Sequence, residues 1–336
     1  MNTTPGPRRA SKHQIADIGR RRLLMALGAA AVVTAFRANI AADYQLTEDK
    51  SFKVVTPPNP GNDAAAARHP GSAWYLLGGF RVSNRTAARK LAALQGAMNE
   101  RAPASYIGYS NEGIDVAQLF IAIRADAYAR KITTAYLYGD SFGGMVAAVL
   151  APLLEQNGIH VRMMVLASAP SNVAQVKDPG KEYIALAGVV VPYMGVVGRL
   201  AAGVWSGLAN PNGEDMYQAA RSGVAQQLDP THSSLILATT QATFLQAFPA
   251  QFDGGVSPAT EVGLLYDPED FIVDAAAAIR GWRVLLPANT AFQYDVPHTG
   301  HASPEFNSET YSTALRVLQD ALAPLPGIPQ PRRRYF

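Results

Sequence analysis

The chain has 336 residues, 48% of them hydrophobic and 16% charged, and it contains no cysteine. This composition supplies a core for one large or two ordinary domains, and it excludes a disordered chain, a disulfide scaffold, a thiolate metal site and a cysteine nucleophile. The net charge of +3 resides at the ends, where residues 1–37 carry +6 and three arginines follow residue 331, so the body is acidic, which argues against nucleic acid as a partner.

Residues 1–42 are typical of an export signal or an N-terminal membrane anchor. Three consecutive arginines, Arg20 to Arg22, precede an apolar run over residues 23–36. As a helix, this run is about 21 Å long, shorter than the roughly 30 Å core of a bilayer. The paired arginines and the short apolar run resemble a bacterial twin-arginine signal, from which Gly19 and Leu23 depart. We therefore predict an exported protein, located in the cell envelope or secreted; the alternative is a membrane anchor formed by residues 23–42.

Short apolar runs then alternate with helical patterns through residues 43–323, which we expect to form one domain. The predicted strands are residues 52–55, 73–77, 105–109, 133–138, 161–166, 261–266 and 291–294. The predicted helices are residues 86–98, 116–130, 144–155, 271–279 and 309–322. This alternation predicts an α/β fold with a mostly parallel central sheet flanked by helices. The strand pattern stops between residues 171 and 255, which predicts a helical cap inserted before the strand at 261–266. Residues 324–336 form a Pro- and Arg-rich tail.

The strongest motif lies at residues 139–144, where Gly-Asp-Ser-Phe-Gly-Gly follows a predicted strand and precedes a predicted helix. A sharp strand-to-helix turn of this kind projects the Ser141 hydroxyl above the sheet edge. Gly139 and Gly143 leave room for the neighbouring strand and helix, and the Phe142 amide at the helix start is directed towards a developing oxyanion. Ser141 is therefore the candidate nucleophile, and Phe142 is the first candidate oxyanion donor.

A serine nucleophile needs a base, usually a histidine, and an acid that orients the base. His298 and His301 follow the last predicted strand. We favour His301 because Gly300 permits the tight loop that returns an imidazole to the sheet edge; His298 is the alternative base. Several carboxylates follow the strand at 261–266, and among them we favour Asp270 as the acid with Asp267 as the alternative.

A second oxyanion donor is expected in the loop after an early strand. Gly78 and Gly79 follow the strand at 73–77 and let the backbone approach a substrate closely. The amide of Gly79 or of Phe80 is the candidate donor.

The chain order Ser141, Asp270, His301, together with the early glycine loop and the helical insert, resembles the α/β-hydrolase fold superfamily over about residues 50–323. The resemblance implies acyl transfer through a covalent serine intermediate, with a cap over the site. It does not assign a subfamily.

We expect a serine hydrolase that cleaves carboxylic ester or thioester bonds of a small-molecule or lipid acyl substrate, with no metal and no organic cofactor. The uncharged insert at residues 183–198 favours apolar acyl groups, with Met194, Trp205 and Phe244 as candidate lining residues. Two alternatives stay open, namely an acyltransferase or cofactor-free perhydrolase on the same triad, and a non-catalytic envelope binding protein. The sequence does not indicate an oligomeric state.

Overall fold

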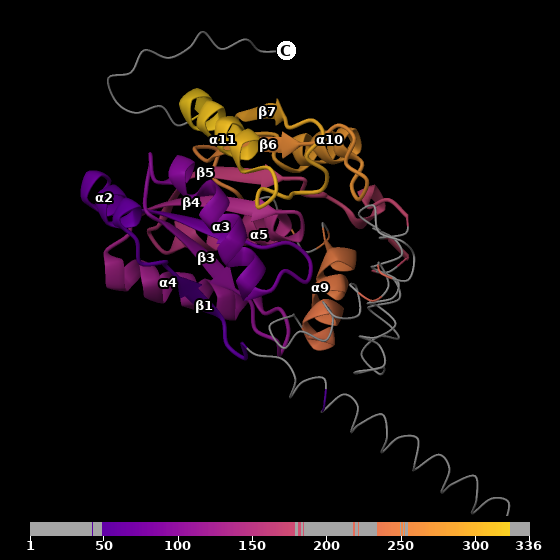
Figure 1. The fold of residues 1–336 in the computed structure, drawn as a ribbon, viewed down its shortest axis with the longest axis horizontal. Coiled ribbons are helices and arrows are strands. Elements are labelled where there is room, and N and C mark those ends of the chain that lie inside the picture. The colour runs from indigo at the N-terminus through magenta and orange to yellow at the C-terminus, as the bar shows by residue number, and fades with distance from the viewer. Residues whose placement is uncertain are drawn as a thin grey trace, which may run out of the picture.

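The protein is described from a computed structural model (Figure 1). The structure describes residues 49–178, 234–248 and 255–322, together with the single residues 42, 181, 182, 184, 218, 221, 250 and 252. Residues 1–41 of the predicted signal or anchor, most of residues 179–233 within the predicted cap, and the predicted tail at 324–336 lie outside the described residues, and the expectations for them stay predictions.

The described residues contain one mixed sheet of seven strands in the order β1-β3-β2-β4-β5-β6-β7, which Figure 1 shows from bottom to top. Only β1, at one edge, is antiparallel to its neighbour within this sheet. The strands are β1 Lys53–Val55, β2 Ser72–Leu77, β3 Ala104–Gly108, β4 Thr134–Asp140, β5 His160–Ala167, β6 Glu261–Tyr266 and β7 Ala291–Asp295. The predicted α/β fold with a mostly parallel sheet is confirmed.

Helices cover both faces of the sheet, and side chains at their N-termini determine where most of them begin. Ser83, Asp115, Ser234 and Asp274 each accept a hydrogen bond from an amide in the first turn of the following helix. The helices are α2 Pro60–Arg68, α3 Asn84–Met98, α4 Val116–Arg130, α5 Phe142–Gln156, α9 Leu235–Ala247, α10 Ala275–Leu285 and α11 Ser308–Leu322, with a short 3-10 helix η1 at Val173–Gln175.

Several predicted helix boundaries differ from the structure, most at α10, which ends at Leu285 rather than at residue 279, and one helix was not predicted. Helix α10 begins at Ala275 rather than at residue 271, because the Asp270 side chain accepts the amides of Ile272 and Val273 and holds that segment in a turn. Helix α5 begins at Phe142, directly after Ser141, rather than at residue 144. Helix α2 was not predicted; its run of alanines between Asn62 and Arg68 gives no amphipathic pattern.

The core lies in two layers, one on each face of the sheet. One layer packs the sheet against α4, α5, α9 and α10, and its large buried side chains include Tyr75, Phe142 and Trp282. The other layer packs the sheet against α3 and α11, with Trp74 and Leu318 buried.

Because β4, β5 and β6 are parallel and adjacent, their carboxyl ends meet at one edge of the sheet. Ser141, the loop after Ala167 and the loop after Tyr266 all lie at this edge.

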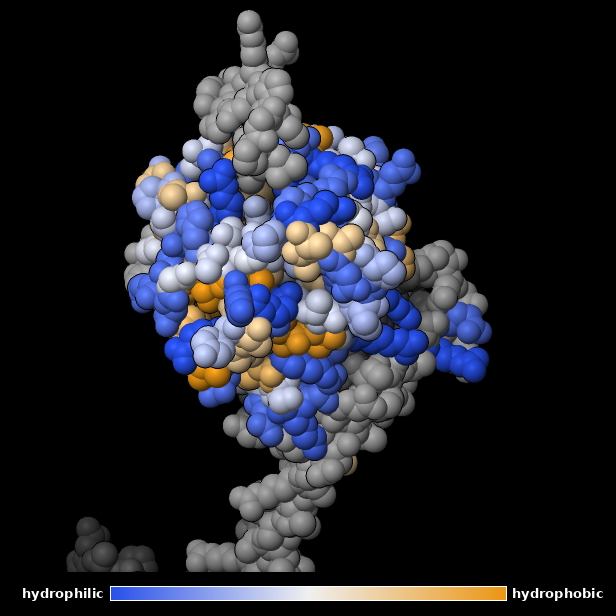
Figure 2. Space-filling model, turned by 90° about the vertical axis from the view of Figure 1, so that its left-hand side faces the viewer, coloured by the Kyte–Doolittle hydropathy of each residue, from blue (hydrophilic) through white to orange (hydrophobic). Residues whose placement is uncertain are grey.

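The surface of the described part is mixed in character. Figure 2 shows one face, on which hydrophilic residues surround smaller hydrophobic areas, as is ordinary for a folded domain. Among the described residues, no helix is both long enough and apolar enough to cross a bilayer.

Candidate active site

Ser141 lies in a strained turn between β4 and α5. Its φ and ψ angles are 50° and −117°, in a region that residues with a side chain rarely adopt. The turn is fixed by the Ser141 amide, which donates to the carbonyl of Ala167 at 2.8 Å. Close packing explains the flanking glycines, since a Cβ atom on Gly143 would lie 2.2 Å from the carbonyl oxygen of Leu77. The local sequence therefore produces the sharp turn that the motif predicts.

Ser141, His301 and Asp270 are connected by two hydrogen bonds. His301 Nε2 lies 2.8 Å from Ser141 Oγ, and His301 Nδ1 lies 2.8 Å from Asp270 Oδ2. The side chain of Asp270 is fully buried, whereas that of His301 keeps 18% of its surface exposed. This arrangement, with one ring nitrogen on a carboxylate and the other on a hydroxyl, can remove the proton from the serine.

The environment of Asp270 keeps its carboxyl ionised. Burial acts to raise the pKa of Asp270, but the hydrogen bond and charge of His301 and the amides of Val273 and Ile272 outweigh it, so the pKa lies below its ordinary value. An ionised carboxylate on Nδ1 favours the imidazole form whose Nε2 faces the serine, and it stabilises the imidazolium.

The alternative acid and base lie elsewhere. Asp267 is buried, and its Oδ2 accepts the amide of Gly300 at 2.7 Å, which holds the histidine loop at the residue before His301. The side chain of His298 is 79% exposed and pairs with Glu269 at 3.3 Å. Among the described contacts, the imidazole on Ser141 Oγ is that of His301 and the carboxylate on this imidazole is that of Asp270, so the geometry favours Asp270 and His301.

The loop with the second candidate oxyanion donor lies directly beside the serine. A Cβ atom on Gly79 would be 3.3 Å from the Cβ of Ser141, so the backbone of this loop passes close to the hydroxyl. The loop is held from two sides, because Tyr109 Oη donates to the carbonyl of Gly78 at 2.9 Å, and the Arg81 amide donates to Gln241 Oε1 at 2.9 Å. The first amide of α5, from Phe142, has no acceptor within its own helix.

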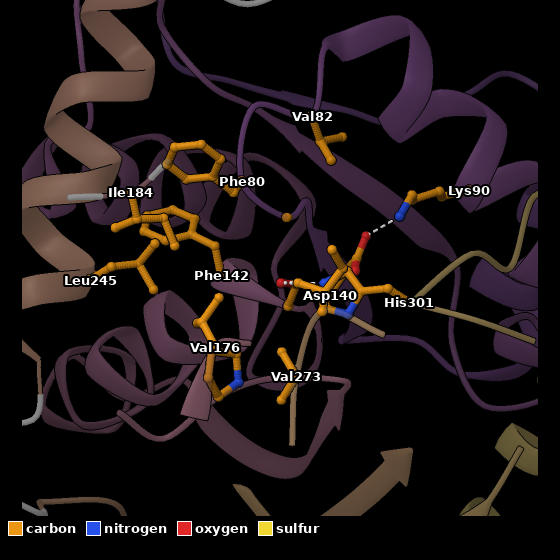
Figure 3. Close-up of a pocket in the computed structure, with 14 residues that line it drawn as sticks. Phe80, Val82, Lys90, Asp140, Phe142, Val176, Ile184, Leu245, Val273 and His301 are labelled. Carbon is orange, nitrogen blue, oxygen red and sulfur yellow. Dashed lines mark hydrogen bonds and ion pairs between the residues drawn. The ribbon is translucent and has the colours of Figure 1, made fainter. Parts of the chain in front are cut away.

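An apolar pocket of about 270 Å³ opens beside Ser141 and His301. Figure 3 shows apolar side chains gathered on one side of His301, and Lys90 on the other side. The apolar lining side chains come from several elements and include Phe80, Val82, Phe142, Pro170, Val176, Ile184, Leu245, Ile272 and Val273. Of the predicted lining residues, Phe244 instead packs behind the pocket, with its ring centroid 5.4 Å from that of Phe142, and Met194 and Trp205 lie outside the described residues.

The sequence analysis missed two charged residues at this site. Lys90 on α3 and Asp140 at the end of β4 line the pocket and form a buried ion pair. Asp140 occupies the variable position before the serine in the motif, where many residue types are tolerated. Lys90 follows Arg89, and a pair of basic residues is typical of a solvated helix face. The sequence around each residue therefore did not indicate a place in the site. Within the described ranges, no group of three or more His, Asp or Glu side chains is placed to hold a metal ion.

No protein-family model matches the chain, and no curated protein matches it in sequence. Solved structures match it in fold. A carboxylesterase from Nitrososphaera gargenis matches with a TM-score of 0.53 at 10% identity over 80% of this chain and 93% of that one. The carboxylesterase CesB from Bacillus subtilis matches with a TM-score of 0.51 at 16% identity over 86% and 98%. The enol-lactonase from Burkholderia xenovorans LB400 matches with a TM-score of 0.52 at 12% identity over 80% and 95%. The chain therefore has the α/β-hydrolase fold.

Proposed function

We propose that this protein is a serine hydrolase that cleaves carboxylic ester or thioester bonds through a covalent acyl-serine intermediate. The observation that carries the proposal is the series of hydrogen bonds from Asp270 through His301 to Ser141, beside an apolar pocket. Because the α/β-hydrolase fold hosts several chemistries, the fold alone does not select one. Two of the structures similar in fold are carboxylesterases, which supports ester chemistry.

In the first half of the reaction, Ser141 Oγ attacks the acyl carbon of the ester while His301 Nε2 accepts its proton. The imidazolium is stabilised by the Asp270 carboxylate on Nδ1. His301 then returns the proton to the leaving alcohol or thiol, which leaves the acyl group on Ser141. In the second half, a water molecule gives a proton to His301 and attacks the acyl-serine; the bond to Ser141 Oγ breaks, His301 returns the proton to this oxygen, and the carboxylic acid is released. These steps require no metal and no organic cofactor.

The negative charge that develops on the carbonyl oxygen needs donors that are already in place. The amide of Phe142 at the start of α5, and the amide of Gly79 or Phe80 in the neighbouring loop, are the donors we assign to it. Hydrogen bonds from Tyr109 to Gly78 and from Arg81 to Gln241 hold this loop in position before substrate arrives. Such preorganisation lowers the barrier because the donors do not reorganise during the reaction.

The lining of the pocket supports an apolar acyl group on the substrate. We expect kcat/KM for p-nitrophenyl esters to rise from acetate towards octanoate, by up to about fourfold for each methylene that is buried.

A Val176→Phe substitution narrows the pocket and should shift the preferred chain length towards shorter esters. The matched control is Val284→Phe, because the Val284 side chain is exposed on α10. A kcat/KM that falls steadily from acetate to octanoate in the wild type contradicts the apolar acyl pocket.

A further inference from the structure

A buried lysine connects the two segments that carry the serine and the histidine. Lys90 lies on α3 with only 8% of its side chain exposed. Its Nζ donates to Asp140 Oδ2 and, at 2.6 Å, to the backbone carbonyl of Ala302, and it lies 3.8 Å from Glu305 Oε2. Figure 3 shows the contact with Asp140 beside His301. Asp140 directly precedes Ser141 in the sequence, and Ala302 directly follows His301.

The histidine loop needs such an anchor because its backbone is strained. Its residues His298, Gly300 and Ala302 all have positive φ values, of 60°, 70° and 42°. A loop in this conformation persists only where its surroundings hold it. Asp267 holds it at the amide of Gly300, directly before His301, and Lys90 holds it at the carbonyl of Ala302, directly after. The imidazole is therefore fixed on both sides.

Burying the ammonium group of Lys90 costs free energy of hydration, which indicates that this residue has a role other than packing. The neighbouring inward positions of α3, Ala87, Leu91 and Leu94, are apolar and buried. A buried ammonium loses its hydration, and an ion pair at such a position is often no more stabilising than a well-packed apolar residue. A lysine here also does what an apolar side chain does not, since it donates to two different segments at once.

We propose, on the basis of the serine hydrolase assignment, that Lys90 is a positioning residue that clamps the Ser141 turn to the His301 loop and, together with Asp140, sets the charge next to the imidazole. Lys90 does not touch the reacting atoms. It acts by holding the 2.8 Å approach of His301 Nε2 to Ser141 Oγ.

The charges and titratable groups around His301 come from several elements. Asp270 and Asp267 lie in the loop after β6, Asp140 at the end of β4, Lys90 on α3, and Glu305 on the histidine loop itself. The hydroxyls of Tyr138 and Tyr311 are buried nearby. Burial raises the pKa of Glu305, against the opposing effect of Lys90. Asp140 is the nearer partner of Lys90, and loss of either member of this pair changes the net charge near the imidazole by one.

The test compares three variants with the wild type, using p-nitrophenyl butyrate as substrate. Lys90→Met should lower kcat by about 100-fold with little change in KM, because the imidazole is no longer held in its reactive position. It should also move the acidic limb of the kcat/KM profile to higher pH, because the unpaired Asp140 carboxylate favours the imidazolium. Asp140→Asn should move the limb to lower pH, because Lys90 then keeps only the more distant Glu305 as a counter-charge.

The double variant Lys90→Met/Asp140→Asn separates clamping from charge. It removes one positive and one negative charge together, so the limb should return close to its wild-type position, while kcat stays low because the Ala302 carbonyl still lacks its donor. If Lys90→Met does not fold, the double variant replaces it in the comparison of kcat with the wild type. The matched control is Arg89→Met, which removes an exposed cation from the same helix and should leave kcat unchanged. Thermal unfolding of each variant establishes that it is folded.

A folded double variant with wild-type kcat overturns the proposal, as does a Lys90→Met variant that raises KM and leaves kcat unchanged. The charge next to His301 can also be followed without any activity, by NMR titration of its ring protons. If the wild type hydrolyses no ester, the proposed function fails, and the NMR titration still tests the electrostatic role of Lys90 and Asp140. A midpoint that does not differ between the wild type, Lys90→Met and Asp140→Asn overturns that role.

Discussion

His301→Ala is expected to lower kcat for p-nitrophenyl butyrate hydrolysis by a factor on the order of 10⁶, the loss typical when the base of a serine hydrolase is removed. Without the imidazole, nothing accepts the proton of Ser141 Oγ, to which His301 Nε2 is hydrogen-bonded at 2.8 Å. Substrate binding in the apolar pocket does not depend on this nitrogen, so KM should change far less than kcat.

His298→Ala is the matched control because it removes the other imidazole from the same loop. Its side chain is 79% exposed and pairs with Glu269 rather than with the serine. We expect activity within about twofold of the wild type, as for most substitutions at exposed positions. A large loss of kcat in His298→Ala, with activity retained in His301→Ala, contradicts the assignment of the base.

Asp270→Asn is expected to lower kcat by about 10⁴-fold at neutral pH, since an amide at this position favours the wrong imidazole tautomer and does not stabilise the imidazolium. Asp267→Asn tests whether this loss is specific, because Asp267 is equally buried and contacts Gly300 rather than the imidazole. Its expected loss of kcat is much smaller. Similar losses in both variants contradict the role of Asp270 as the orienting acid.

The same substitution predicts a pH dependence of stability. Although burial alone would raise the pKa of Asp270, its hydrogen bonds hold that pKa below the ordinary value. A carboxyl whose pKa is lowered in the folded protein stabilises the fold at pH values above its pKa in the unfolded chain, which is about 3.9. This contribution is lost as the pH falls through the pKa that the carboxyl has in the folded protein. The difference in Tm between wild type and Asp270→Asn should therefore be largest above about pH 5 and shrink below about pH 4. A difference that grows as the pH falls contradicts this account.

Much of the fold could be predicted from sequence because its signals are local. The strand at residues 261–266 and the helix at 116–130 have the predicted bounds, and the other described strands differ by two residues or fewer. Buried parallel strands are apolar on both faces, so each stands out against its flanking helices. The position of Ser141 followed from a short motif with strict steric requirements, which the close contacts of Gly143 illustrate.

The rest depends on contacts between distant segments. Nothing near Lys90 in the sequence indicates that it is buried, because its partners Asp140 and Ala302 lie 50 and 212 residues away. The start of α10 was misplaced for a similar reason, since Asp270 uses its side chain for a turn and Asp274 caps the helix instead. The pattern of apolar residues at 271–273 alone does not distinguish this turn from a first helical turn.

The fold alone does not assign the substrate of this protein. The structures similar in fold include carboxylesterases and an enol-lactonase at 10–16% identity, and these chemistries differ in the acyl group and in the leaving group. The apolar lining of the pocket supports the proposed apolar acyl group. Products formed with and without an added alcohol or peroxide acceptor separate hydrolysis from transfer to that acceptor.

Labelling with a fluorophosphonate probe tests the central claim most directly, because the probe reacts covalently with a serine only where a neighbouring base activates it. We expect the wild type to be labelled on Ser141, and Ser141→Ala and His301→Ala to lose the label while His298→Ala keeps it. A wild type that is folded and remains unlabelled, or a label that persists in Ser141→Ala, contradicts the assignment of Ser141 as an activated nucleophile.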